Sequence, residues 1–129
     1  MATYVGLDVS TRETAICVVS ETGDRLWEGR RATDPEAIAE AIRRHAPEVV
    51  RVGMETGLMA PWLWHELKEH RIPIVCLHAR HAKAALSLQM NKTDRNDALS
   101  LARLVRSGWY REVAVKAFDT HRLRHRHTP

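Results

Sequence analysis

The spacing of apolar residues changes near residue 34, and this change constrains the fold more than any other feature of the chain. Before it, three short runs with the composition of strands cover residues 3–9, 14–20 and 25–31. Only short turn sequences separate them, Ser10-Thr-Arg-Glu and Glu21-Thr-Gly-Asp. Since turns this short join antiparallel neighbours, the first part of the chain predicts three consecutive antiparallel strands.

After residue 34, helical segments alternate with short apolar strands. Asp34 and Pro35 supply an N-cap acceptor and a proline in the first turn of a helix that ends before Pro47. The expected elements continue with a strand over 49–54, a helix over 61–70, a strand over 74–77 and helical structure over 79–107. Strands that alternate with helices become parallel neighbours. The order predicts an α/β fold with a mixed five-stranded sheet, three antiparallel strands then parallel strands, with flanking helices, as in ribonuclease-H-like proteins.

The composition is that of one soluble domain. The chain has 129 residues, 44% hydrophobic and 28% charged, so it can bury a core without a disulfide framework. No apolar run approaches the roughly 20 residues that span a bilayer, and residues 1–10 lack the pattern of a secretory signal. Cys17 and Cys76 lie inside apolar runs and are expected to be buried. We therefore expect a cytoplasmic protein with no membrane partner.

The net charge of +4 is unevenly divided along the chain. Residues 1–77 hold 9 Lys/Arg and 12 Asp/Glu, a balance of −3, whereas residues 78–129 hold 11 and 4, a balance of +7. Such asymmetry favours a polyanionic partner, most often nucleic acid, although a solvated basic face has the same composition. The best candidates for contacts to a phosphate backbone are Arg80, Lys83, Lys92 and Arg95.

Two carboxylates stand at the ends of apolar strands. Asp8 is flanked by Leu7 and Val9, and Glu55 directly follows the strand over 49–54. An acid inside an apolar run costs free energy unless it is paired, bound to a cation or at a sheet edge. Because the two strands are expected to be parallel neighbours, both acids should lie at the edge of the sheet where α/β proteins place their sites.

Two further acids lie in the run Lys92-Thr-Asp-Arg-Asn-Asp-Ala. A helix capped by Thr93 puts Asp94 and Asp97 about 5–6 Å apart on one face. That face continues through Ala98, Leu101, Leu104 and Val105, so it should pack on the sheet. The helix dipole also favours acids in a first turn, which is an alternative explanation for this pair.

Together, Asp8, Glu55, Asp94 and Asp97 are an all-oxygen set of candidate ligands. Such ligands suit Mg²⁺ or Mn²⁺. Two such ions can activate a nucleophile and stabilise a leaving oxygen in phosphodiester chemistry.

Five segments resemble the N-terminal RuvC-like domain of DEDD transposases, the RNA-guided insertion-sequence recombinases. They are Gly6-Leu-Asp-Val-Ser-Thr-Arg-Glu-Thr, Met54-Glu-Thr-Gly, Ala79-Arg-His-Ala-Lys-Ala-Ala, Asn91-Lys-Thr-Asp-Arg-Asn-Asp-Ala and Gly108-Trp-Tyr-Arg-Glu-Val. The resemblance runs from about residue 3 to about residue 126 and places the four acids of the family on the four carboxylates above. It implies a RuvC-like fold and Mg²⁺-dependent DNA strand cleavage and exchange, guided by a structured RNA.

The resemblance also sets expectations for domain organisation. We expect residues 1–110 to form the RuvC-like domain and residues 111–129 to be a basic linker toward a coiled coil and a C-terminal serine domain that this chain lacks. We therefore expect a truncated protein that is inactive alone in strand exchange and gives at most feeble nicking of DNA, with a homo-oligomer in the full-length form. Two alternatives are a catalytically idle nucleic-acid-binding fragment and an actin-like ATPase or kinase, whose first hairpin also carries Gly-x-Asp-x-Ser.

Overall fold

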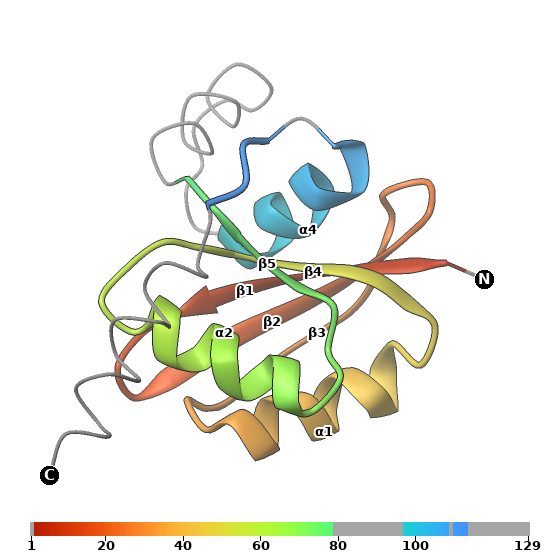
Figure 1. Cartoon of the computed structure of the whole chain (residues 1–129). Helices are drawn as coiled ribbons and strands as arrows, with labels where there is room; N and C mark the ends of the chain where they lie inside the picture. Colours follow the sequence, from red (N-terminus) through yellow and green to blue (C-terminus); the bar gives the residue numbers. More distant parts are fainter. Residues whose placement is uncertain (1, 79–96, 109, 114–129) are drawn as a thin grey trace, which may run out of the picture.

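The chain folds into a mixed five-stranded sheet with helices on both faces (Figure 1). The computed structural model describes residues 2–78, 97–108 and 110–113, and at Asp97 only the backbone. The strands are β1 (Thr3–Val9), β2 (Glu13–Ser20), β3 (Arg25–Ala32), β4 (Val49–Glu55) and β5 (Ile74–Leu77), and the helices are α1 (Pro35–His45), α2 (Ala60–Glu69) and α4 (Asp97–Ser107). Every strand, and each of α1 and α2, agrees with the sequence prediction to within one residue at either end.

The strand order is β3-β2-β1-β4-β5. The pairs β1–β2 and β2–β3 are antiparallel, whereas β1–β4 and β4–β5 are parallel. This is the predicted arrangement, and it follows from the connections: two hairpin turns join the first three strands, while α1 and α2 are the crossovers that return the chain for β4 and β5. No helix in the described part of the chain is long and apolar enough to cross a membrane.

The face of the sheet that α1 and α2 cover holds the larger part of the core (Figure 1). Alternate residues of the strands, Leu7 and Met54 among them, meet the apolar sides of both helices and are fully buried. The side chain of Asp34 caps α1 by accepting a hydrogen bond of 3.0 Å from the amide of Ala37, as the sequence predicted. The cap and the buried stripe together orient α1 across the sheet.

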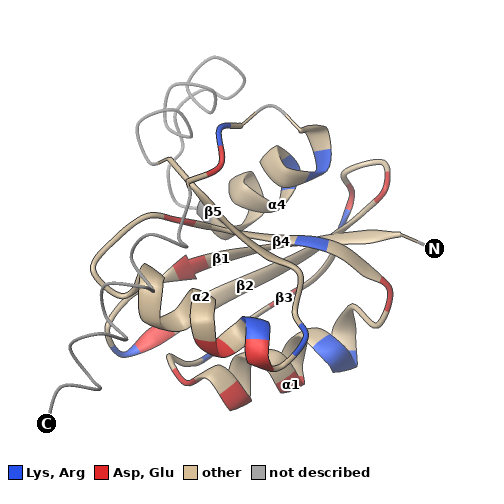
Figure 2. Ribbon diagram, in the orientation of Figure 1, with Lys and Arg blue, Asp and Glu red and all other residues tan. Residues whose placement is uncertain are grey.

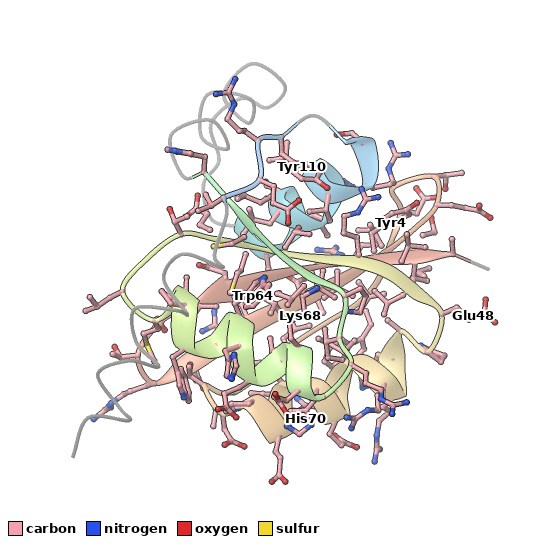
Figure 3. All side chains as sticks on the ribbon, in the orientation of Figure 1. Tyr4, Glu48, Trp64, Lys68, His70 and Tyr110 are labelled. Carbon is pink, nitrogen blue, oxygen red and sulfur yellow. The ribbon has the colours of Figure 1, made fainter. Side chains whose placement is uncertain are left out.

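The face that α4 covers is shaped by two glycines. A Cβ at Gly6 would overlap the carbonyl oxygen of Ala98 and the amide nitrogen of Ala102, so the backbone of α4 lies directly on β1. At Gly53, a Cβ would overlap the side chain of Val105. As predicted, the inward side of α4 is apolar, and Ala98, Leu101, Leu104 and Val105 are all buried. Tyr4 and Tyr110 border this second packing layer (Figure 3).

The end of α2 has an unusual residue in a common motif. The amide of Arg71 donates to the carbonyl of Lys68 (2.9 Å), and the amide of Ile72 donates to the carbonyl of Leu67 (3.0 Å), which together form a Schellman motif. Glycine normally occupies the left-handed position of this motif, but here Arg71 does, with a φ of 63°. A side chain in this conformation costs about 1 kcal/mol. Sequence reasoning predicted the end of the helix but not this conformation.

The chain after α4 returns to the outer edge of β5. Glu112 pairs with Leu77 in an antiparallel bridge, the amide of His78 donates to the carbonyl of Arg111, and that of Val113 donates to the carbonyl of Cys76. These bonds of 2.8–3.0 Å tie the beginning of the segment that the sequence assigned to a linker to the sheet.

Both cysteines are buried free thiols, as predicted, and they lie on opposite faces of the sheet. Burial raises the pKa of Cys17 and of Cys76 to about 11. Near pH 8 the reactive thiolate is then roughly 100-fold scarcer than for an exposed thiol. We expect iodoacetamide to leave both cysteines of the native chain unmodified over a period that alkylates them fully in urea. Mass spectrometry measures this, and rapid modification of either thiol under native conditions would contradict it.

Candidate active site at the carboxyl edge of the sheet

Asp8 and Glu55 lie side by side at the carboxyl ends of two parallel strands. Leu7 is in register with Met54, so the residues that follow them occupy neighbouring positions on β1 and β4, whose backbones are about 5 Å apart. Residues two apart on a strand share a face, so Asp8 shares the face of Gly6, and Glu55 shares the face of Gly53. Both carboxylates therefore lie on the side of the sheet that α4 covers. Asp8 is exposed and Glu55 is half-buried.

The direction of α4 brings its described beginning to the same edge. Near the C-terminal end of α4, Arg103 and Arg106 donate 3.0 Å hydrogen bonds to carbonyls of the turn between β2 and β3. This turn lies at the start of β1, because Ser20 pairs with Thr3. The helix therefore runs antiparallel to β1, and the backbone of Asp97 lies toward the end of β1 that carries Asp8.

A pocket with a volume of about 250 Å³ connects the two carboxylates to α4. Its lining comes from the ends of β1 and β4, the turn after each of them, the start of α2, and Leu101. Leu101 is one helical turn after Asp97. On the loop between β4 and α2, Leu58 is 96% exposed at this pocket. Sequence reasoning missed Leu58, since exposure of a single leucine leaves no signal in the sequence.

The predicted site residues divide into those that the structure places and those that it does not describe. Asp8 and Glu55 are brought together as predicted. The predictions for Asp94, the side chain of Asp97, and the four cations Arg80, Lys83, Lys92 and Arg95 lie outside the described residues. Among the side chains that are described, no group of three or more His, Cys, Asp or Glu could hold a metal ion.

The placed pair fits a divalent cation chemically. Two carboxylates at adjacent positions repel one another, and a cation between them offsets this repulsion. Carboxylate oxygens are the ligands that Mg²⁺ and Mn²⁺ prefer. The pocket is open to solvent at Asp8, so a hydrated ion and a phosphate group can reach it. The arrangement can thus contribute part of a metal site and leaves room for a substrate.

Several solved structures have a similar fold. The Thermus thermophilus RuvC in complex with a Holliday junction substrate is 16% identical, with a TM-score of 0.58 over 88% of this chain and 100% of that chain. A second Thermus thermophilus RuvC structure is 17% identical, with a TM-score of 0.58 over 86% and 99% of the two chains. The large terminase nuclease of a thermophilic phage, with bound zinc, is 16% identical, with a TM-score of 0.52 over 84% and 61%. The fold is thus RuvC-like, of the ribonuclease-H class.

The family follows from the sequence itself. Residues 5–127 match the family model of the DEDD transposases of the IS110 type, described as transposase. The chain belongs to this family. No curated protein matches it in sequence.

Proposed function

We propose that this chain is the catalytic RuvC-like part of a transposase that cleaves and exchanges DNA strands with a divalent metal. The observation that carries the proposal is the convergence of Asp8 and Glu55 in one pocket, at the end of the sheet toward which α4 begins. Membership in a transposase family gives the reaction class, and it favours this function over the actin-like kinase alternative.

In this proposal, Asp8, Glu55, Asp94 and Asp97 hold Mg²⁺, with Mn²⁺ as a substitute. The ions would supply charge neutralisation and an activated nucleophile for attack on a phosphodiester. The chain positions the site through Gly6, which seats α4 on β1 and so brings the backbone of Asp97 toward Asp8. Glu55 is half-buried beside the apolar layer, so its side chain has less freedom than that of Asp8.

DNA is the proposed substrate, a structured guide RNA the proposed partner, and a homo-oligomer the proposed active form. Support for DNA comes from the RuvC neighbour, which binds a Holliday junction, and from the basic balance of residues 78–129. We further propose that Arg80, Lys83, Lys92 and Arg95 contact the phosphate backbone, and that residues 111–129 lead toward a coiled coil and a serine domain. Exchange of strands between two DNA molecules needs more than one active site, which is the reason to propose several copies.

Metal binding is the direct test of the site. We expect Mg²⁺ or Mn²⁺ to raise the melting temperature of the chain by several degrees, because a ligand that binds only the folded state stabilises it. Asp94→Asn should reduce this gain substantially. Asp24→Asn is the matched control, since Asp24 lies in the turn between β2 and β3 at the other end of β1. Scanning calorimetry with and without metal measures both.

An equal gain in the Asp94→Asn variant would remove Asp94 from the proposed site. Metal binding without Mg²⁺-dependent nicking of DNA would instead favour the alternative of a catalytically idle nucleic-acid-binding fragment. The two measurements therefore separate the ligands of the metal from the chemistry of the site.

A further inference from the structure

A second pocket lies at the opposite end of the parallel strands, where α1 and α2 finish. It has a volume of about 460 Å³ and is lined by the last turn of α1, the start of β4 and the connection from α2 to β5. Its apolar lining includes Ile42, Val49 and Ile72. The length of β4 separates it from the carboxylate pocket by about 20 Å, so the two pockets are distinct.

Three basic side chains surround this second pocket: Arg43, His70 and Arg71. Figure 2 shows Lys and Arg at the last turns of α1 and α2 and on the connection that follows α2. His70 lies at the end of α2 beside α1 (Figure 3). One Nη of Arg43 is 3.4 Å from Nδ1 of His70 and 3.5 Å from its carbonyl oxygen, so the two side chains share one wall of the pocket.

These arginines have no carboxylate partner in the described part of the chain. The ion pairs of that part join Arg25 to Glu28, Arg30 to Glu13, and Arg44 to Glu40, and neither Arg43 nor Arg71 forms one within the described residues. Arg44 is next to Arg43 on α1, and its guanidinium lies 3.1 Å from Glu40. Arg44, which is paired with Glu40, therefore lies outside the pocket, whereas its neighbour Arg43 lines it.

A stabilising role at helix ends explains only some of these charges. Basic residues in the last turn of a helix offset its dipole, and this accounts for Arg43, Arg44 and Lys68. The dipole also favours a cation at Arg71, directly after the end of α2, but it does not explain why this side chain stands at a left-handed position that glycine would adopt without strain. Arginine therefore carries a conformational cost at this position that glycine would not, and its side chain adds a positive charge to the wall of the pocket.

We propose that the pocket lined by Arg43, His70 and Arg71 binds a phosphate group of a nucleic acid strand, away from the carboxylate pocket. The inference rests on the proposed function for the presence of a nucleic acid ligand. The two guanidinium groups supply only hydrogen-bond donors, and guanidinium forks match phosphate oxygens. The ligand is the phosphodiester that DNA and RNA share.

The test compares two variants of the 129-residue chain. Arg43→Gln combined with Arg71→Gly removes both pocket arginines, and Arg43→Gln combined with Arg44→Gln removes the same charge while retaining Arg71. Fluorescence anisotropy measures Kd in EDTA, for a labelled DNA duplex and a labelled RNA hairpin of equal length, at several salt concentrations. Calorimetry measures the melting temperature of each variant.

We expect the first variant to lose about 10-fold more affinity than the second. Its affinity should also depend less steeply on salt concentration, by the amount that corresponds to about one lost phosphate contact. Arg71→Gly alone should weaken binding and yet raise the melting temperature by about 2–4 °C, because glycine relieves the left-handed strain. If Arg71 had only a structural role, its replacement would not weaken binding while raising the melting temperature. Loss with DNA only, or with RNA only, identifies the source of the phosphate.

Equal affinities of the two double variants would overturn the inference and leave the proposed function intact, provided that the native chain binds nucleic acid. If the native chain binds neither DNA nor RNA, both the inference and the proposed function fail. A fall in the melting temperature of Arg71→Gly in parallel with weaker binding would assign Arg71 a structural role and would also count against the pocket.

Discussion

Asp8→Asn is expected to reduce the feeble metal-dependent DNA nicking of this chain to background, because metal ions in such a site stabilise the charge of the transition state by several kcal/mol, about 10³-fold in rate. The substitution preserves the shape of the side chain and removes one anionic ligand. Asp8 is exposed, so the melting temperature in metal-free buffer should stay within a few degrees of the native value. The gain in melting temperature on adding Mg²⁺ should fall.

The measurement is nicking of supercoiled DNA in Mg²⁺ and in Mn²⁺, with Asp24→Asn as the control. Asp24 is exposed, and its carboxylate accepts a hydrogen bond of 3.0 Å from the hydroxyl of Thr22, far from the pocket. The control should nick DNA at the native rate. Native activity in Asp8→Asn would show that the pocket between β1 and β4 is not the site of cleavage.

Most of the backbone architecture could be predicted from the sequence, because turn-forming or helix-starting residues mark where the strands end. The limits of β1 and β5 were predicted to the residue, and the order of hairpins and crossovers left few arrangements of the sheet. The proximity of Asp8 and Glu55 was predicted by the same reasoning. Parallel strands end at the same edge, so two acids at strand ends come together once the strands are neighbours.

Packing across long sequence separations was not readable. In the sequence, Gly6 is a glycine in a strand, which indicates a bulge, a bend or a close approach without saying which. Only the structure shows the backbone of α4 against it, more than 90 residues later in the chain. The left-handed Arg71 was missed for a related reason, since a non-glycine residue gives no local sign of that conformation.

Charge counted along the chain also differs from charge in space. Residues 1–77 have a negative balance, yet Arg43 and Arg71 from this part converge on one pocket. The helices α1 and α2 end on the same side of the sheet because each serves as a crossover between parallel strands. The net charge of a long segment therefore does not reveal a local group of basic side chains within it.

Gly6→Ala is expected to destabilise the fold by about 3 kcal/mol or more, a large part of the stability of an ordinary domain. The new methyl group would meet the backbone of Ala98 and Ala102, which a change of rotamer cannot move. Alanine gains about 0.5–1 kcal/mol over glycine in a strand through lower entropy of the unfolded chain, and this is too small to offset the overlap. To relieve it, α4 must move away from β1 and carry Asp97 away from Asp8.

Urea denaturation of two glycine variants tests this expectation. Gly57→Ala is the control, because a Cβ there meets nothing within 4 Å and its backbone is not left-handed, so its midpoint should match or exceed the native one. Gly53→Ala separates side-chain from backbone overlap: its methyl group meets Val105, and Val105→Ala should restore part of the lost stability. Shortening Ala98 or Ala102 to glycine cannot rescue Gly6→Ala, since the overlapping atoms belong to the backbone. A native midpoint for Gly6→Ala would show that α4 does not rest on β1 at this residue, and the route by which the fold brings Asp97 toward Asp8 would then be wrong.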